Sequence, residues 1–191
     1  MGQAHTQLAI TCLWWAWALI WLALSLARMS DARREPAWQR VAYIAPLVAA
    51  IVLNASMPGP GGLLVGQVFP YQSIAGVAGV ALSLFSLAFS VWARLALGRN
   101  WSGTVTIKQD HQLVTCGPYR IARHPIYLGM LMMFVGNAIG LGQWRTILAL
   151  ALFLAAIVPK LRKEERWMEE HFGDAYRGYA HRTAALVPFL Y

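Results

Sequence analysis

Five long apolar runs restrict this 191-residue chain to folds that cross a membrane several times. An α-helix rises about 1.5 Å per residue, so roughly 20 apolar residues cross the hydrocarbon core of a bilayer. Only 13% of the residues are charged, against about 25% in a typical soluble domain. We therefore predict an all-α integral membrane protein, a single domain over residues 1–191, with about five transmembrane helices. The predicted spans cover residues 8–27, 41–57, 71–93, 126–141 and 146–158.

The fourth and fifth runs are short, and only the four residues from Gly142 to Arg145 separate them. This spacing predicts a tight helical hairpin whose helices extend through flanking residues or lie where the bilayer is thin. The first run has no Lys or Arg before it and is longer than the apolar part of a typical signal peptide. We expect it to be a retained anchor.

The charged residues fall almost entirely on one side of these spans. Fifteen of the 16 Lys and Arg and all eight Asp and Glu lie between spans one and two, between spans three and four, or after span five. Arg145 is the exception. The positive-inside rule then predicts an outer N-terminus and a cytoplasmic C-terminus.

The net charge of +8 favours anionic membrane lipids as partners over nucleic acid, because the basic residues are spread along the membrane edges. The two cysteines, Cys12 and Cys116, lie in different parts of the topology. They predict neither a disulfide nor a metal site.

Small side chains recur at helical spacing in the third and fourth runs, a pattern that favours close helix packing in lipid. Asn137 is the one strongly polar side chain of the fourth run, and we expect it to bond to a neighbouring helix rather than to a ligand. The small residues are Gly76, Gly79, Ser83, Ser86 and Ser90 in the third run and Gly129, Gly136 and Gly140 in the fourth.

The most informative polar block precedes the fourth run, from Gly117 to Gly129. Pro125 suits the first turn of a helix, where its missing N–H costs nothing. Arg123 and His124 would then lie at the helix N-terminus, where free backbone N–H groups and the helix dipole favour an anion. These residues either anchor the helix at the membrane interface or bind an anionic ligand group. Upstream, the alternation of residues 104–107 predicts an extended piece that lies over the membrane surface.

A second polar block, residues 160–179, follows the last apolar run and can return to the same membrane face. It predicts a helix from Lys160 to about His171, with Gly173 as the stop. At 100° per residue, Glu165 falls inside the apolar stripe of this helix and Glu164 at its edge. A carboxylate in that position is costly unless it is paired. One of the two therefore either meets Arg or Lys or holds the amine or hydroxyl groups of a ligand.

The ordered pattern of these blocks resembles the isoprenylcysteine carboxyl methyltransferase family, to which the phospholipid methyltransferases are related. The resemblance covers residues 97–188, whereas the first two runs match only in hydropathy. The motifs that carry it are Leu97-Gly98-Arg99-Asn100-Trp101-Ser102, His111-x-Leu113-Val114, Gly117-Pro118-Tyr119, Arg123-His124-Pro125-x-Tyr127-x-Gly129, Glu164-Glu165 and Phe172-Gly173-x-x-Tyr176-x-x-Tyr179.

The resemblance implies an S-adenosylmethionine-dependent methyltransferase whose cofactor pocket is formed on the cytosolic side by the loop before the fourth run and the C-terminal helix. The family has an arginine that recognises the acceptor carboxylate four residues before its glutamate; here Lys160 stands in that position and Arg162 lies nearby. Lysine balances a carboxylate charge but lacks the bidentate fork of arginine. By position, the resemblance assigns the cofactor to His111, Gln112, Leu113, Val114, Tyr119, Arg123, His124, Pro125, Ile126, Tyr127 and Glu164.

We predict carboxyl methylation of a lipophilic, membrane-resident acceptor of the isoprenylcysteine type, with Lys160, Arg162 and Glu165 as catalytic residues. A carboxylate acceptor needs no base, whereas an amine acceptor must first lose a proton, for which Glu165 or His124 is a candidate. The alternatives are a phospholipid N-methyltransferase of the phosphatidylethanolamine type, an NADPH-dependent sterol-reductase-like enzyme, and a non-catalytic scaffold or transporter. Against transport, the runs carry no mid-membrane ionisable residue and no repeated half.

Overall fold

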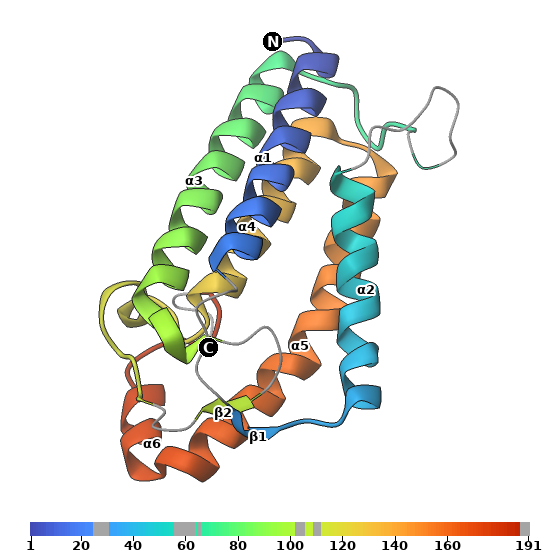
Figure 1. The fold of residues 1–191 in the computed structure, drawn as a ribbon. Coiled ribbons are helices and arrows are strands. Elements are labelled where there is room, and N and C mark those ends of the chain that lie inside the picture. The colour runs from blue at the N-terminus through green and yellow to red at the C-terminus, as the bar shows by residue number, and fades with distance from the viewer. Residues whose placement is uncertain (25–30, 56–63, 65, 102–105, 109–111, 188–191) are drawn as a thin grey trace.

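The computed structural model describes residues 1–24, 31–55, 64, 66–101, 106–108 and 112–187. This part of the chain forms an all-α bundle of five long helices, as predicted, with a short two-stranded sheet at one end (Figure 1). A shorter helix, α6 (Asp174–Ala180), follows them. The long helices are α1 (Gln3–Leu24), α2 (Ala37–Ala55), α3 (Ser73–Leu97), α4 (Pro125–Leu141) and α5 (Trp144–Phe172).

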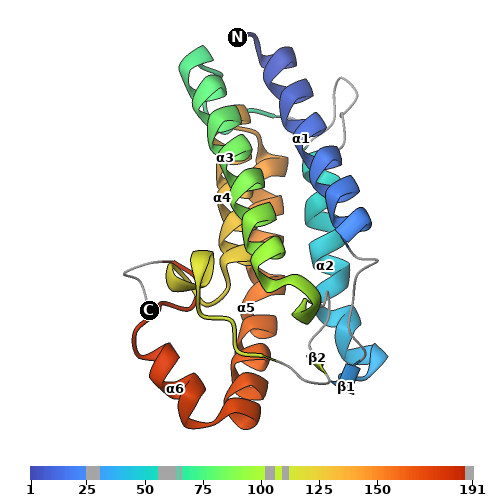
Figure 2. The ribbon, with the colours of Figure 1, turned by 60° about the vertical axis from the view of Figure 1, so that its left-hand side comes forward.

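Helix α3 lies along α4 and helix α2 lies along α5, with α1 packed against both α2 and α3 (Figures 1 and 2). Small residues let α3 and α4 approach closely. A Cβ atom at Gly79 would lie 2.4 Å from the carbonyl oxygen of Gly136 and 2.5 Å from Cα of Gly140. A Cβ atom at Gly129 would lie 2.7 Å from Cβ of Ser90. The predicted packing faces of the third and fourth runs are thus confirmed.

Asn137 joins three helices inside the apolar bundle. Its amide is fully buried and is hydrogen-bonded to Asn54 of α2 (2.8 Å) and to Ser83 of α3 (3.1 Å). A buried amide is costly unless it is hydrogen-bonded, so this contact helps to fix which helix faces meet. The expectation that Asn137 bonds to a neighbouring helix is confirmed.

The hairpin between α4 and α5 turns at Gly142, whose φ of 58° lies in the left-handed region that favours glycine. The fifth run and the predicted helix from Lys160 are not separate helices, because α5 continues through Pro159 to Phe172. Proline removes one backbone donor and bends a helix, but membrane helices tolerate it. The predicted helix from Lys160 is therefore the last part of α5, which sweeps below the bundle towards α6 (Figure 1). It ends before Gly173, as expected.

The two strands lie at the same end of the molecule as α6 (Figures 1 and 2). β1 (Asp31–Arg34) pairs antiparallel with β2 (Thr106–Lys108). β2 confirms the second half of the extended piece predicted at residues 104–107, of which residues 104 and 105 lie outside the described residues. β1 is not predicted from the sequence, because its four residues show no alternation of apolar and polar side chains.

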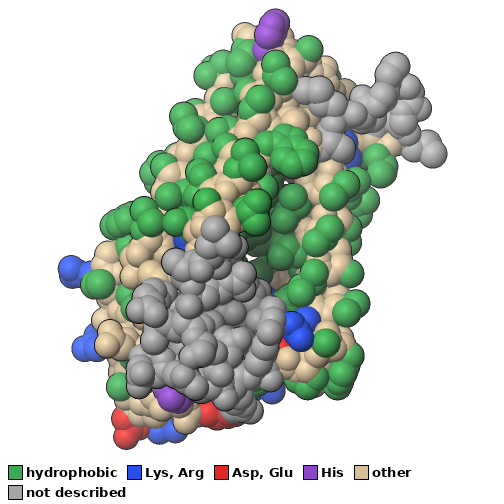
Figure 3. All heavy atoms as spheres, viewed as in Figure 1, with side chains coloured by type: hydrophobic (Ala, Val, Ile, Leu, Met, Phe, Trp, Pro, Cys, Tyr) green, Lys and Arg blue, Asp and Glu red, His purple; other side chains and the backbone are tan. Residues whose placement is uncertain are grey.

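Charged side chains gather at the end of the molecule that holds the strands and α6, while apolar side chains cover its long sides (Figure 3). Within the described ranges, α1, α2, α3 and α5 are long and apolar enough to cross a membrane, and α4 is a shorter apolar helix of 17 residues. At about 1.5 Å per residue, α4 falls only a few ångströms short of a bilayer core. The fold is that of an integral membrane protein, and the candidate site lies at its charged end.

Candidate functional site

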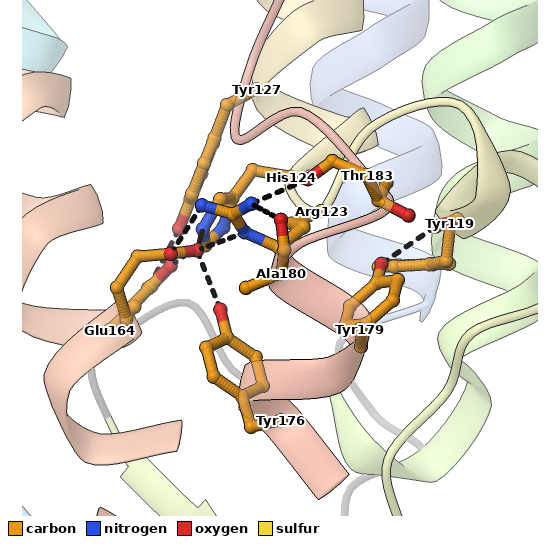
Figure 4. Close-up of polar contacts among 10 residues, drawn as sticks. Tyr119, Arg123, His124, Tyr127, Glu164, Tyr176, Tyr179, Ala180 and Thr183 are labelled. Atoms are coloured by element: carbon orange, nitrogen blue, oxygen red, sulfur yellow. Dashed lines mark hydrogen bonds and ion pairs between the residues drawn. The ribbon is translucent and has the colours of Figure 1, made fainter. Parts of the chain in front are cut away.

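The site is built around the start of α4, which the chain enters from a tight turn. The 3-10 turn Gly117–Arg120 begins at a glycine with φ of 59° and buries Tyr119. Helix α4 begins at Pro125 as predicted, and His124 precedes it as the N-cap residue. The side chains of Arg123 and His124 point from this helix start towards α5 and α6 (Figure 4).

Arg123 holds three segments of the chain together. Its Nε donates to Oε1 of Glu165 (3.0 Å) and its Nη2 donates to Oε2 (2.6 Å), a two-point pairing with α5. Its Nη1 donates to the carbonyl oxygens of Ala180 (3.0 Å) and Thr183, at the end of α6 and in the turn that follows. Because arginine presents its donors in a rigid fork, one side chain fixes α4, α5 and the end of α6 in a single arrangement.

Glu165 is a carboxylate with four hydrogen bonds. Besides Arg123, it contacts Nε2 of His124 (2.7 Å) and accepts a hydrogen bond from the hydroxyl of Tyr176 (2.6 Å). Burial acts to raise the pKa of Glu165, but the hydrogen bonds from His124 and Arg123 outweigh it and lower the pKa to about 2. Burial and the contact with Glu165 raise the pKa of Tyr176, which stays a protonated donor. The sequence leaves two alternatives for a carboxylate inside the apolar stripe: it pairs with Arg or Lys, or it holds a ligand. Glu165 pairs with Arg123.

Glu164 lies one residue earlier and has other partners. Its Oε1 accepts a hydrogen bond from the hydroxyl of Tyr127 (2.9 Å), and Nζ of Lys160 lies 3.8 Å from the same oxygen. Nδ1 of His124 lies 3.5 Å from Oε2, so His124 has a carboxylate near each ring nitrogen. Six of the predicted site residues thus form one polar cluster between α4 and α5. They are Arg123, His124, Tyr127, Lys160, Glu164 and Glu165.

Backbone N–H groups at the start of α4 are less open to a ligand than the sequence indicates. The N–H of Arg123 donates to the carbonyl of Ala184 (2.8 Å), and that of His124 donates to the carbonyl of Ala185 (3.0 Å). Two carboxylates from α5 also lie at this helix terminus. The chain itself supplies much of the negative charge that was expected from a ligand there.

An open hollow of about 750 Å³ borders the cluster on the side of α6. This volume lies within the range of small-molecule and cofactor sites, roughly 300–1,000 Å³. Its lining carries cations, carboxylates and an aromatic ring. No group of three His, Cys, Asp or Glu that could hold a metal ion occurs among the residues with described positions. The lining residues are Arg123, Glu165, Glu169, Tyr176, Arg177, Ala180, His181, Arg182, Thr183 and Ala184.

Three further predicted site residues lie beside or away from the cluster. Tyr119 is buried, and its carbonyl accepts a hydrogen bond from the hydroxyl of Tyr179 (2.6 Å), a pair that lies to one side in Figure 4. Ile126 is buried in an apolar cluster with Trp101, so its side chain contributes to packing. Arg162 is exposed and lies about 200° around the helix from residue 160, on another face of α5. Its catalytic role stays a prediction.

The loop residues assigned to the cofactor are only partly described. His111 lies outside the described residues. Gln112 is exposed, and its N–H donates to Oδ1 of Asn100 (3.4 Å). Leu113 and Val114 are half-buried. Their contact with a cofactor stays a prediction that rests on the resemblance.

Several residues of the hollow are missing from the sequence-based assignment. Tyr176 belongs to the motif that starts at Phe172, but that motif alone did not indicate its contact with Glu165. Ala180, Thr183 and Ala184 contribute backbone carbonyl groups to the start of α4. A carbonyl leaves no trace in the pattern of side chains, so these contacts could not be predicted.

Known proteins resemble the part of the chain that contains the cluster. Protein-S-isoprenylcysteine O-methyltransferase B of Arabidopsis thaliana is 35% identical over 104 residues, which cover 51% of this chain and 51% of that protein. The protein-S-isoprenylcysteine O-methyltransferase of Saccharomyces cerevisiae is 27% identical over 133 residues, 65% of this chain and 54% of that protein. The cobalt-zinc-cadmium resistance protein CzcN of Cupriavidus metallidurans is 35% identical over 100 residues, 49% of this chain and 44% of that protein.

These alignments span about half the length of the curated relatives. The family described as phospholipid methyltransferase matches residues 74–175, slightly more than half of the chain. The matched segment runs from the start of α3 into α6 and contains the whole polar cluster. The motifs and the relatives therefore agree with the resemblance found in the sequence, and the chain belongs to the phospholipid methyltransferase family, to which the isoprenylcysteine methyltransferases are related.

Proposed function

We propose that the chain is an S-adenosylmethionine-dependent methyltransferase that carboxyl-methylates a lipophilic, membrane-resident acceptor of the isoprenylcysteine type. The observation that carries the proposal is the polar cluster around Arg123 and Glu165, which borders a hollow at the charged end of an apolar bundle. A water-soluble cofactor can enter from this end while the lipid part of the acceptor stays among the helices. The names of the Arabidopsis and yeast relatives, both protein-S-isoprenylcysteine O-methyltransferases, support this class of acceptor.

The charged side chains around the hollow suit the amino-acid part of S-adenosylmethionine, an amino acid joined through a sulfonium to a nucleoside. Arg182 and His181 can meet its carboxylate and Glu169 its ammonium group. When bound, S-adenosylmethionine supplies a methyl group on a positively charged sulfur. Arg123 is already bonded to α5 and to the end of α6, so its part is to hold the walls of the hollow in place.

The state of Glu165 favours a carboxylate acceptor over an amine. Transfer to a carboxylate forms a C–O bond, breaks the C–S bond of the sulfonium and releases no proton, so it depends on alignment and the exclusion of water. Transfer to an amine also needs a base. Glu165 was a candidate for that base, but with four hydrogen bonds and a pKa of about 2 it is a poor proton acceptor at neutral pH. We therefore assign Glu165 a positioning role.

Calorimetry on the purified protein in detergent micelles tests cofactor binding. We expect saturable heat with S-adenosylmethionine and none with NADPH, the cofactor of the sterol-reductase-like alternative. Arg123→Gln breaks the pairing with Glu165 and should weaken binding about tenfold or more, the scale of a lost charge-assisted hydrogen bond. Arg166→Gln removes an exposed arginine of α5 and should bind like the wild type. A wild-type chain that binds no S-adenosylmethionine contradicts the proposal.

Transfer of a labelled methyl group identifies the acceptor. We expect the label on a prenylcysteine analogue, as a methyl ester that mild base releases, and not on phosphatidylethanolamine. Label on the phospholipid amine that resists base would establish the N-methyltransferase alternative in place of carboxyl methylation.

A further inference from the structure

The part of α5 that carries the site residues depends on other segments for its position. Pro159 donates no backbone hydrogen bond to the preceding turn, which weakens the helix at that point. Beyond this residue, α5 sweeps below the bundle and carries Glu164 and Glu165 with it (Figure 1). A small shift or rotation of this part would separate both carboxylates from their partners at the start of α4.

Lys163 ties this part of α5 to the beginning of α2. Its Nζ donates to Oε2 of Glu35 (2.6 Å) and to the side-chain oxygen of Gln39. Glu35 comes just before α2, its side chain is fully buried, and its Oε1 accepts a hydrogen bond from the hydroxyl of Tyr43. The same ammonium group lies 5.7 Å from the centre of the Trp167 ring, within the range of a cation–π contact. We call Glu35, Gln39, Tyr43 and Lys163 the α2 clamp.

The α2 clamp holds α5 from the side opposite Arg123. At 100° per residue, Lys163 and Glu165 lie about 200° apart around the helix, so they project from nearly opposite faces of α5. Glu165 pairs with Arg123 at the start of α4, whereas Lys163 pairs with Glu35 beside α2. An ion pair with a buried partner is costly to break, because a buried charge is then left uncompensated. Two ion pairs therefore fix the site-bearing part of α5 between α2 and α4.

Glu35 lies outside the segment that matches the phospholipid methyltransferase family. The match covers residues 74–175, which include Lys163 but not Glu35, Gln39 or Tyr43. The elements on either side of Glu35 hold it in place, because β1 pairs with β2 and α2 lies along α5. The N-terminal part of the chain thus reaches the site region through one buried carboxylate.

We propose that Glu35 is a positioning residue for methyl transfer, which acts through Lys163 to fix the site-bearing part of α5 relative to the bundle. The inference rests on the proposed function, in which the cofactor lies in the hollow and the lipid part of the acceptor lies among the helices. Glu165 and Glu169 of α5 line the hollow, and α2 belongs to the bundle. The α2 clamp therefore sets the alignment of the two reactants, while Arg123 maintains the walls of the hollow. A displacement of about 1 Å can slow such a reaction about 100-fold.

Loss of the α2 clamp should slow methyl transfer and leave cofactor binding nearly unchanged. Glu35→Gln keeps the shape of the side chain but removes the charge that Lys163 meets. In single-turnover transfer from S-adenosylmethionine to a prenylcysteine analogue, we expect the rate constant to fall by roughly tenfold or more. The Kd of S-adenosylmethionine should stay within about threefold of the wild-type value. Rates are compared at a temperature at which tryptophan fluorescence shows every variant folded, so a loss of stability alone would not change them.

Further variants separate the α2 clamp from a general change in charge. Lys163→Met should slow transfer as much as Glu35→Gln, and the double variant should be little slower than either, because both changes remove the same contact. Lys163→Arg keeps the ion pair and should retain a rate close to that of the wild type. Arg166→Gln removes an exposed cation of α5 and should leave the rate unchanged. If Glu35→Gln does not fold, Lys163→Met gives the same comparison. Wild-type rates in the folded variants of this pair would overturn the proposal.

A distance measurement decides the α2 clamp independently of activity. Spin labels at Val48→Cys in α2 and Arg166→Cys in α5, both at exposed positions, are attached to a chain without its two native cysteines. Double electron–electron resonance should give one narrow distance distribution, which Glu35→Gln broadens and Lys163→Arg does not. An unchanged distribution in Glu35→Gln would overturn the proposal. A chain that transfers no methyl group to any acceptor contradicts the proposed function, and the distance distribution then still decides whether the α2 clamp holds α5.

Discussion

Two neighbouring glutamates of α5 differ in chemistry because folding gives them different partners. Glu165 is surrounded by hydrogen-bond donors from the start of α4 and from α6. Glu164 has a tyrosine hydroxyl and the buried Lys160 instead. A carboxylate that accepts several hydrogen bonds, one of them from a cation, is strongly held in its charged form. Glu165 is thus a fixed anion that organises the helices around the hollow.

Acid should weaken the fold through Glu165. Its pKa is about 2 in the folded chain and 4.5 ordinarily, so the charged carboxylate stabilises the fold fully above about pH 4.5. This contribution is lost as the pH falls through about 2. With a side chain that is 24% exposed, it amounts to about 2–3 kcal/mol. Glu165→Gln should therefore unfold more easily at pH 7 and lose less stability than the wild type between pH 7 and pH 3.

Tryptophan fluorescence during thermal unfolding in micelles measures this difference. Glu169→Gln is the matched control, because Glu169 lies one helical turn further along α5 and its ion pair with Arg177 is exposed. That variant should follow the wild type at both pH values. The same loss of stability on acidification in Glu165→Gln and in the wild type would refute the role given to Glu165.

The sequence alone predicts that Glu165 needs a partner, but it does not predict which residues that partner or partners are. The helical phase placed Glu165 inside the apolar stripe of α5 and indicated that a carboxylate there needs pairing. The partner could not be chosen, because Arg123 and Tyr176 come from segments 42 residues before and 11 residues after it. Spacing along one helix defines a face, whereas the contact across elements depends on how three segments pack.

At the level of elements, the hydropathy of the five runs was sufficient to predict five helices and the α4–α5 hairpin. The sequence predicts the fifth run and the helix from Lys160 as separate segments, divided at Pro159. In the structure α5 crosses that position and carries the site residues on its last four turns. A membrane helix tolerates an internal proline, so charge and proline together mark the end of the apolar part of α5 rather than the end of the helix.

The packing of α3 against α4 should depend on Gly79. Its missing Cβ leaves room for the backbone of Gly136 and Gly140, and an alanine there would place Cβ within 2.5 Å of backbone atoms that cannot rotate away. Gly79→Ala should force the helices apart and cost about 1–3 kcal/mol, the usual range for overpacking. Thermal unfolding in micelles measures the loss.

Gly178→Ala is the control for this substitution. Gly178 lies in α6, and a Cβ atom there would meet no atom within 4 Å. Alanine also favours a helix more than glycine does, so this variant should be as stable as the wild type or slightly more stable. If Gly79→Ala unfolded at the wild-type temperature, close packing of α3 and α4 would not limit stability.

At the scale of the whole molecule, the uneven distribution of Lys and Arg between the two ends of the bundle predicts its orientation in the membrane. Of the Lys and Arg that the structure describes, Arg145 lies at the other end; it is only 2% exposed and donates to the carbonyl of Leu53 (2.7 Å) and the side chain of Gln143 (2.7 Å). It is held inside the protein and is not an interfacial charge. Among the Lys and Arg with described side chains, the others therefore lie at the end that holds the candidate site.

The positive-inside rule then predicts that the site faces the cytoplasm. Cys116 is exposed at the charged end, and Gln72 is exposed just before α3 at the other end. With Cys12→Ser as background, a membrane-impermeant maleimide should label Cys116 in inside-out vesicles and not in intact cells. A cysteine at Gln72, in a chain that also carries Cys116→Ser, should show the opposite pattern. The same cells and reagent serve both variants. Labelling of Cys116 from outside would mean that the candidate site faces away from the cytoplasm, which would contradict the proposed use of a cytosolic cofactor.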